Sequence, residues 1–400
     1  MLIVGCDWSR SKHDFLFMSP DGDVLLRKTV PHTAHGLHQI SQEIAHRQPD
    51  ATKVRVVLEL HNGALVAWLH QQGYTVYGIN PKSAQRARDR YRPSGAKDDR
   101  SDAFVLADAL RVDAGGLRAI SPGQPESLEL ARWATLRRKL LERRTRGSQR
   151  LRGLLDEWCP TLSQLCRDLE RNWQRALLSE FSLDADFCGA HGNRLRGFAK
   201  THRLTERTTA RLLDAKSSAP LEVAAGTAAE IRFEIRALLE EIELLTRQAR
   251  EVEKQMAELL GRHPDAELLR SLPVYGTPTA APMAAGLGRD APVVSSWTDL
   301  AAKWGMAPIT VQSGRSRQVR RRRACDQTVH QALLFFAFNT AMRPDCWASE
   351  HYRSKRDSGM GHYAALRSVA LRWVKILYRL WRDRVPYDEA VHRARRAAAA

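Results

Sequence analysis

Four acidic side chains in the first 102 residues have the types and spacing of ligands for a divalent cation: Asp7, Glu59, Asp99 and Asp102. Asp7 and Glu59 each directly follow an apolar run, while Asp99 and Asp102 share one face of an expected helix. Carboxylates on a packing face destabilise a fold unless a cation neutralises them. Oxygen ligands favour Mg²⁺ (or Mn²⁺) over zinc, and such a cluster could hold two ions about 4 Å apart for in-line attack on a phosphodiester. The alternative for Asp99 and Asp102 is a first helical turn whose acids complement the helix dipole.

The elements expected around these acids form an α/β domain of the order β-β-β-α-β-α-β-α. Strands are predicted at 2–6, 15–18, 24–30, 54–58 and 75–79, and helices at 34–47, 64–71 and from 97 onward. If the first and fourth strands pair in parallel, their carboxyl ends meet at one edge of the sheet, where such sheets bind ligands. Asp7 and Glu59 would then lie together, and the last helix could bring Asp99 and Asp102 to the same edge.

A serine in the C-terminal third is the second candidate for chemistry. Ser313 stands beside Gly314 and ahead of a run of arginines: Arg315, Arg317, Arg320, Arg321, Arg322 and Arg323. A serine hydroxyl is a weak nucleophile, so attack on a phosphate needs stabilisation of the developing charge, which arginines or metal ions could supply. Taken alone, these residues favour a loop serine that caps the next helix.

The composition points to a folded protein with a polyanionic partner. Hydrophobic residues make up 43% of the chain, and 63 Lys and Arg against 45 Asp and Glu give a formal net charge of +18. Nucleic acid is the commonest partner for such a charge. No apolar span long enough for a bilayer and no signal peptide is visible, and the six cysteines form no Cys-x-x-Cys pair. We therefore expect no membrane contact and a reducing, cytoplasmic location.

The middle of the chain reads as long helices. Residues 126–157 predict one basic helix that contains few acidic residues to pair with its arginines and lysines. We therefore expect its basic face to contact nucleic-acid phosphates as readily as to be simply solvated. The residues expected to contact nucleic acid there are Arg137, Arg138, Lys139, Arg143 and Arg144. Between residues 231 and 259, apolar residues alternate in steps of four and three, which predicts a coiled coil with the basic helix, another protomer or both. The predicted domains are 1–115, 125–262 and 263–400.

Several motifs together resemble one family. Those of the first domain are Gly5-x-Asp7, Glu59-Leu60-His61-Asn62-Gly63 and Lys97-x-Asp99-Arg100-x-Asp102. Those of the last are Gly305-x-x-Pro308 followed by Ser313-Gly314, and Pro386-Tyr387-Asp388. They resemble the DEDD-type, RuvC-like insertion-sequence transposases, the bridge-RNA-guided serine recombinases that include the Piv-type DNA invertases.

The resemblance implies a fold, a mechanism and partners. The fold is an RNase H-like (RuvC-like) α/β domain, then an α-helical coiled-coil region, then a mainly α-helical transposase domain. The four acids are implied as catalytic metal ligands, and Ser313 as the nucleophile of a covalent phosphoserine intermediate, with Ser316 as the second choice. Asp98 stands where the family more often has a neutral residue, so it is either a neighbour of the site or an alternate ligand. The implied partners are donor and target DNA, a structured guide (bridge) RNA, and further copies of the chain, a dimer assembling to a tetramer.

Two other functions stay open on the sequence. The first is a metal-dependent, RuvC-like, structure-specific endonuclease in which water attacks and Ser313 is a structural cap. The second is a non-catalytic nucleic-acid-binding protein with a degenerate nuclease domain, against which the four intact acids argue.

Overall fold

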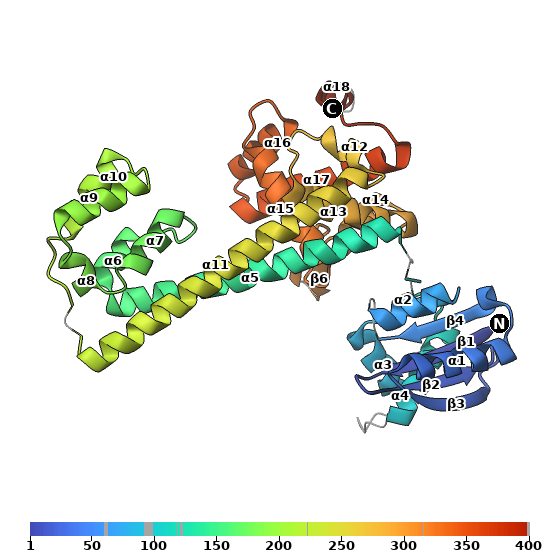
Figure 1. Ribbon diagram of the computed structural model, residues 1–400. Helices are drawn as coiled ribbons and strands as arrows, with labels where there is room; N and C mark the ends of the chain where they lie inside the picture. The colour runs from blue at the N-terminus through green and yellow to red at the C-terminus, as the bar shows by residue number, and fades with distance from the viewer. Residues whose placement is uncertain are drawn as a thin grey trace. The chain divides into compact units, whose positions relative to one another are not determined.

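The computed structural model describes residues 1–59, 63–91, 99–117, 119–120, 123–221, 223–314 and 316–397. The chain divides into two compact units, Met1–Pro125 and Glu126–Ala400, which are described separately below. The first unit is mixed α/β and the second is mostly helical (Figure 1). This confirms the predicted fold class at that level. The boundaries predicted within the second unit stay predictions.

The sheet of the first unit has five strands in the order β3-β2-β1-β4-β5. They are β1 (Leu2–Trp8), β2 (Lys12–Met18), β3 (Val24–Pro31), β4 (Val54–Leu58) and β5 (Thr75–Gly78). β2 pairs antiparallel with β1 and with β3, whereas β4 pairs parallel with β1 and with β5. The carboxyl ends of β1 and β4 therefore meet at one edge, as the sequence argument required.

Helices cover both faces of this sheet. They are α1 (Ala34–Arg47), α2 (Ala64–Gln71), α3 (Pro81–Tyr91) and α4 (Asp99–Val112). α1 and α2 share a hydrophobic core with one face of the sheet, and α3 and α4 share another with the opposite face. α3 was not predicted. Asn80 caps its start by accepting a hydrogen bond from the backbone N–H of Ser83 at 2.9 Å, and Pro81 follows directly, which is a start signal the prediction overlooked.

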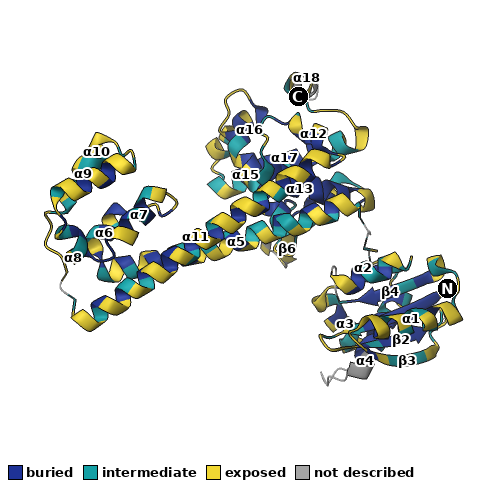
Figure 2. Cartoon of the chain, viewed as in Figure 1, coloured by how far each residue is buried: buried dark blue, intermediate teal, exposed yellow. Residues whose placement is uncertain are grey.

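Two long helices of the second unit, α5 (Pro125–Trp158) and α11 (Ala225–Arg262), lie side by side and run antiparallel (Figure 1). The apolar residues of the predicted seam in α11 are all buried: Ile231, Ile235, Leu238, Ile242, Leu245, Ala249, Val252, Met256 and Leu259. Figure 2 shows buried and exposed residues interleaved along this helix. They share hydrophobic cores with apolar residues of α5, such as Leu140 and Leu155. The seam thus packs on the basic helix of the same chain, which was one of the pairings left open.

Shorter helices pack at both ends of this pair. One group holds α6 (Pro160–Leu165), α7 (Asn172–Glu180), α8 (Asp184–Cys188), α9 (Gly192–Thr201) and α10 (Glu206–Ala215). The other holds α12 (Ala266–Arg270), α13 (Thr277–Asp290), α14 (Trp297–Lys303), α15 (Gln327–Ala341), α16 (Trp347–Asp357), α17 (His362–Asp383) and α18 (Glu389–Ala397). Each group has its own hydrophobic core.

A two-stranded hairpin interrupts the second group of helices, and it was not predicted. Its strands are β6 (Ile309–Ser313) and β7 (Ser316–Arg320), paired antiparallel from Ile309 with Arg320 at the base to Ser313 with Ser316 at the tip. Gly314 in the turn has a φ of +55°, a left-handed conformation that favours glycine. The prediction that Ser313 caps the next helix is wrong, because that helix, α15, is capped by Asp326, whose carboxylate accepts hydrogen bonds from the N–H groups of Thr328 and Val329.

Candidate active site

Acidic side chains gather at the carboxyl edge of β1 and β4. Cys6 and Leu58 are paired in the parallel register, so Asp7 and Glu59 each stand one residue beyond that pair. Asp7 is also the direct cross-strand partner of Asp14 on β2. Like charges directly opposite each other destabilise a sheet, and Lys12 offsets part of this charge, its Nζ lying 3.7 Å from Oδ2 of Asp14. Asp14 is an acid that the sequence analysis did not select, because it lies inside a strand and outside the motifs.

Gly5 explains how α4 reaches this edge. A Cβ atom added at Gly5 would lie 2.0 Å from the carbonyl oxygen of Ala103 and 2.9 Å from the backbone nitrogen of Ala107. The backbone of α4 therefore rests directly on β1, which no larger residue than glycine permits here. Asp102, next to Ala103, is thereby brought to the strand end that carries Asp7, and the glycine of the Gly5-x-Asp7 motif has a structural reason.

Two of the four predicted acids converge on one arginine. Arg88 on α3 donates a hydrogen bond from Nε to Oδ1 of Asp102 at 2.9 Å and another from Nη2 to Oε1 of Glu59. The side chain of Asp102 is only 6% exposed and that of Arg88 is 21% exposed. Burial lowers the pKa of Arg88, but the hydrogen bond to Asp102 and the charge of Glu59 outweigh it and raise the pKa above its ordinary value. A cation thus already holds Glu59 and Asp102 together.

The donors at this edge suit a hard divalent cation. Carboxylate oxygens are the ligands that Mg²⁺ and Mn²⁺ prefer, and Glu59 and Asp102 present theirs to one positive centre. Within the described residues, no group of three or more His, Cys, Asp or Glu side chains is gathered closely enough to hold a metal ion. α4 begins at Asp99, whose side chain is outside the described part of the chain, as is Asp98.

The hairpin places Ser313 at the end of β6, in the second compact unit. The side chains of Ser313 and Arg317, and all of Arg315, lie outside the described residues. Ser316, opposite Ser313, is exposed. Arg320 at the base of β7 donates hydrogen bonds from Nε and Nη2 to Oε1 of Gln318, at 3.1 and 2.6 Å.

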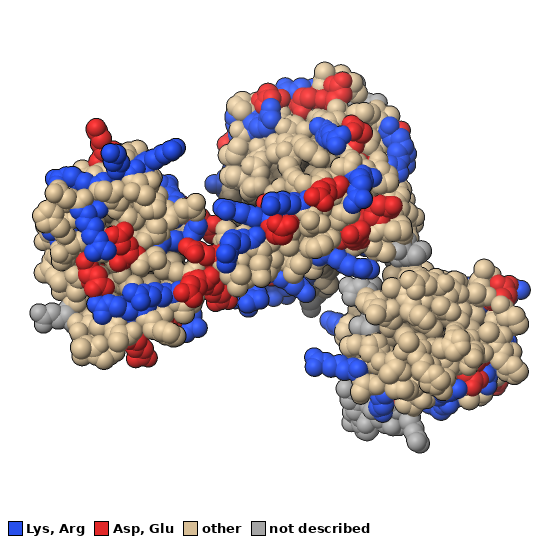
Figure 3. Space-filling model, in the orientation of Figure 1, with Lys and Arg blue, Asp and Glu red and all other residues tan. Residues whose placement is uncertain are grey.

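The basic helix α5 has more acidic partners than its own sequence indicated. The ion pairs are Arg137–Glu253 at 2.5 Å, Arg138–Glu142 at 2.5 Å, Arg143–Glu241 at 3.5 Å and Arg144–Glu170 at 2.8 Å. Three of these partners come from other segments, two of them from α11, so the few acidic residues within α5 do not reflect how many ion pairs its arginines make. Figure 3 shows Lys and Arg interleaved with Asp and Glu over this part of the surface. Nucleic-acid contact by these residues stays a prediction.

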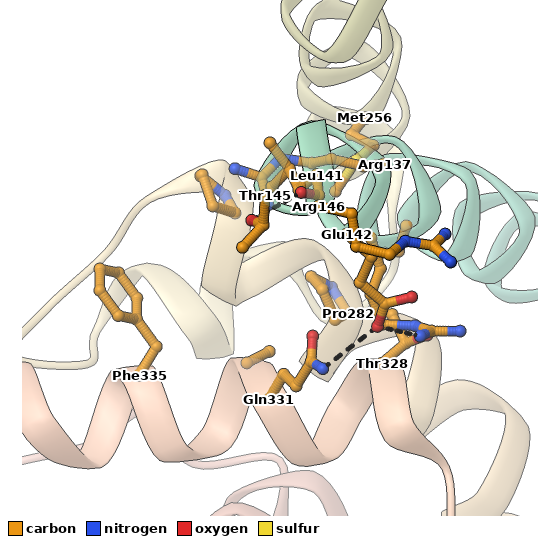
Figure 4. A pocket seen from close by; sticks show the side chains of 14 residues that line it. Arg137, Leu141, Glu142, Thr145, Arg146, Met256, Pro282, Thr328, Gln331 and Phe335 are labelled. Atoms are coloured by element: carbon orange, nitrogen blue, oxygen red, sulfur yellow. Dashed lines mark hydrogen bonds and ion pairs between the residues drawn. The ribbon is translucent and has the colours of Figure 1, made fainter. Parts of the chain in front are cut away.

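A cavity of about 740 Å³ opens where α5, α13 and α15 meet (Figure 4). Glu142 accepts hydrogen bonds there from Arg138 and from Gln331, at 2.5 and 3.5 Å. Phe335 contributes an aromatic ring and is 56% exposed, and Arg146 adds a charge that has no ion-pair partner among the described residues. The cavity therefore combines apolar and cationic groups, but much of its charge is already neutralised.

None of the helices in the described parts of the chain carries an apolar stretch long enough to cross a lipid bilayer.

Comparison with known proteins identifies the class. The DEDD transposase model of the IS110 group, described as a transposase, matches residues 4–160, and the model of the transposase IS116/IS110/IS902 family matches residues 266–353. The first match covers the edge with Asp7, Glu59, Asp99 and Asp102, and the second covers the hairpin with Ser313. The chain is thus a transposase, an enzyme that cleaves and transfers DNA.

Relatives match over nearly the whole chain. The protein assigned as the transposase of the IS117 mini-circle of Streptomyces coelicolor is 28% identical, over 97% of this chain and 95% of that protein. The 43.6 kDa protein of insertion element IS110 from the same organism is 27% identical, over 97% and 95%. The 42 kDa protein of insertion element IS900 of Mycobacterium paratuberculosis is 26% identical, over 97% of both chains. The chain belongs to the IS110/IS116 family of insertion-sequence transposases.

Proposed function

We propose that this transposase cuts and exchanges DNA strands with a metal-dependent site formed by Asp7, Glu59, Asp99 and Asp102, and with Ser313 as the nucleophile. The observation that carries the proposal is that Glu59 and Asp102 both bind the guanidinium group of Arg88, at the sheet edge that also holds Asp7. The order and directions of the five strands support an RNase H-like fold for this domain.

The proposed chemistry has two transfers. The Oγ of Ser313 attacks a backbone phosphorus, the bond to the 3′ oxygen breaks, and that oxygen takes up a proton, leaving a phosphoserine diester and a free 3′-hydroxyl. The 3′-hydroxyl of a different strand then attacks the same phosphorus, and Ser313 leaves with a proton. Mg²⁺ (or Mn²⁺), when bound by the acids, would supply charge stabilisation to the transition state. Strands are exchanged without hydrolysis, because each bond broken is replaced by another phosphodiester.

The proposed partners follow from the family resemblance and the charge. Donor and target DNA are the substrates, a structured bridge RNA encoded by the element selects them by pairing, and the net charge of +18 suits both polyanions. We propose that the acids and Ser313 of one active site come from different protomers of a tetramer assembled from dimers. The buried seam between α5 and α11 supports a coiled-coil geometry for this pair. The proposed location is the bacterial cytoplasm, on the nucleoid when DNA is bound.

Denaturing gel electrophoresis tests the mechanism. The protein is incubated with labelled donor and target DNA, Mg²⁺ and RNA transcribed from the flank of the element. We expect a covalent protein–DNA adduct with the wild type, none with Ser313→Ala or Asp102→Asn, and a normal amount with Ser316→Ala. Ser316 is the matched control, since it is the exposed partner of Ser313 across the hairpin.

Two outcomes would replace the proposal. Cleavage without an adduct that persists in Ser313→Ala would make the protein a hydrolytic, metal-dependent endonuclease. DNA binding with no cleavage, unchanged in Asp102→Asn, would make it a non-catalytic nucleic-acid-binding protein.

A further inference from the structure

The cavity between α5, α13 and α15 has the composition of a ligand site. Its volume is about 740 Å³, and its apolar walls include Ala134, Leu141, Met256, Pro278, Pro282 and Ala332. Ligand sites of this size are typically apolar, with a few polar groups that fix the orientation of the ligand. The polar groups here come from α5 and α15, and their arrangement indicates which ligand fits.

Hydrogen bonds between α5 and α15 show which residues face each other across the cavity. Nε of Arg138 on α5 donates a hydrogen bond to Oγ1 of Thr328 on α15 at 3.1 Å. One turn further along both helices, Nε2 of Gln331 lies 3.5 Å from Oε1 of Glu142. The two helices therefore advance in the same direction along this wall.

Phe335 and Arg146 follow one turn later on the same two helices, and both line the cavity (Figure 4). Phe335 is 56% exposed, and Arg146 is exposed and has no ion-pair partner among the described residues. Phe338, the next turn of α15, is a second exposed ring. Aromatic rings and an unpaired cation thus stand together at the open side of the cavity.

Glu142 and Gln331 keep hydrogen-bonding capacity for a ligand. The 3.5 Å separation between them is long for a hydrogen bond. Oε1 of Glu142 accepts from both Arg138 and Gln331, whereas Oε2 has no partner among the described residues. Carboxylates accept hydrogen bonds from the amino group of cytosine, and the amide of glutamine pairs with adenine. Arg138 balances the charge of Glu142 and Arg137 pairs with Glu253, which leaves Arg146 as the cation for an anion.

We propose that this cavity binds one unpaired nucleotide of a nucleic-acid strand, with its base on Phe335 and its phosphate on Arg146, an inference that rests on the proposed nucleic-acid partners. Every base has a flat face that can stack on an aromatic ring, and a phosphate pairs with a guanidinium group. Gln331 is four residues from Phe335, about 6 Å along the helix axis, so the stacked base presents its edge to Gln331 and Glu142.

The bound nucleotide belongs to a single strand, because bases paired in a duplex are already stacked on their neighbours. Guide RNA and an opened DNA strand share this chemistry. The charge of the chain favours a nucleotide over a second copy of the protein as the occupant. Two copies each carry a formal net charge of +18 and repel each other, whereas a strand brings the anion that Arg146 lacks.

Base stacking is tested with single strands that have or lack bases. Fluorescence polarisation measures binding of a labelled cytosine oligonucleotide, as DNA and as RNA, and of an abasic DNA strand of the same length, in EDTA so that no metal-dependent step intervenes. We expect Phe335→Leu to weaken binding of the cytosine strand at least about fivefold and to leave binding of the abasic strand unchanged. The larger loss, with DNA or with RNA, identifies the source of the nucleotide.

Two further variants control for the loss of the ring. Phe335→Tyr keeps an aromatic face and should keep the wild-type affinity. Phe233→Leu is the matched control, because Phe233 on α11 is 76% exposed and does not line the cavity. It should bind every strand as the wild type does.

The salt dependence of binding tests the phosphate contact. Each phosphate contact of a single strand contributes about 0.7 to the slope of log affinity against log salt. We expect Arg146→Gln to lower the magnitude of the slope by about 0.7 for the cytosine strand and for the abasic strand, because both carry the phosphate. Arg146→Lys keeps the charge and should keep the slope.

Three results would overturn the proposal. Equal losses for the cytosine and abasic strands in Phe335→Leu would exclude base stacking, and an unchanged slope in Arg146→Gln would exclude the phosphate contact. If Phe335→Leu binds the strands normally but changes the particle mass in light scattering, the cavity is a contact between copies of the chain.

Stability and chemistry are measured separately. Because Phe335 is exposed, Phe335→Leu should unfold at the wild-type temperature, and a marked fall would show that the ring is structural. The binding assay is also independent of the proposed mechanism. The expected losses without any covalent adduct in the wild type would keep the nucleotide site and reject the recombinase. An adduct in the wild type without those losses would reject the nucleotide site alone.

Discussion

Replacing Arg88 by glutamine would leave Glu59 and Asp102 facing each other without the guanidinium that now joins them. A hydrogen bond to a charged group contributes about 1.5–3 kcal/mol, and breaking a fully buried ion pair costs about 3–5 kcal/mol. Arg88 and Glu59 are 21% and 27% exposed, so solvent screening reduces these values. We expect the metal-free first unit to lose about 2 kcal/mol of unfolding free energy, seen as a lower unfolding temperature in calorimetry.

The same substitution should have the opposite effect on metal binding. At the proposed metal site of the wild type, a divalent cation has to displace Arg88 from the two carboxylates. The free energy needed to break the Arg88 ion pairs makes the binding of the metal less favourable by the same amount. If about 1.4 kcal/mol is lost in this way, Arg88→Gln should bind Mg²⁺ about tenfold more tightly than the wild type. Isothermal titration calorimetry of the full chain with Mg²⁺, without DNA, measures this directly.

Arg86→Gln is the control for that experiment, because Arg86 lies on the same helix, is exposed and has no partner among the described residues. It should change neither stability nor affinity for Mg²⁺. If Arg88→Gln is less stable but binds Mg²⁺ no better than the wild type, Arg88 is a permanent part of the site and the displacement argument is refuted.

Three further predictions concern stability. Gly5→Ala would place a methyl group 2.0 Å from the carbonyl oxygen of Ala103, so it should cost at least about 1–3 kcal/mol in denaturant unfolding. Asp290→Asn removes the charge of a buried carboxylate that accepts hydrogen bonds from Trp304 and Arg289. It should lower the free energy of unfolding of the second unit by about 3–5 kcal/mol, measured by calorimetry. Burial lowers the pKa of His263, so the unfolded chain binds a proton that the folded chain does not. Stability should therefore fall as the pH drops below about 6.5, and His263→Gln should flatten that slope in a pH series of unfolding curves.

The positions of the strand-end acids could be predicted because they depend on local patterns. Apolar runs mark β1 and β4, and their parallel pairing brings Asp7 and Glu59 to one edge. Arg88 could not be found in that way, since the polar helix that carries it has a single buried residue, Ala84, and lacks an apolar period. The hairpin was missed for a related reason: its strands are short and hold few apolar residues, Ile309 and Val311 in β6 and Val319 in β7, all of them exposed.

The pairing of α5 could not be inferred from its own sequence either. Arg137 and Glu253 are 116 residues apart, and only the antiparallel packing of α5 on α11 brings them together. Charge counted along one helix therefore overstates the charge that reaches solvent. The useful signal for nucleic-acid contact is the charge left after tertiary ion pairing.

The charge balance at the edge of the sheet determines how a metal ion can bind there. Arg88 balances one of the two negative charges of Glu59 and Asp102, so a metal ion at this edge must compete with an internal cation. Metal binding at the acids should be weak in the free protein and should become favourable once a bound DNA phosphate adds oxygen ligands to those of the protein.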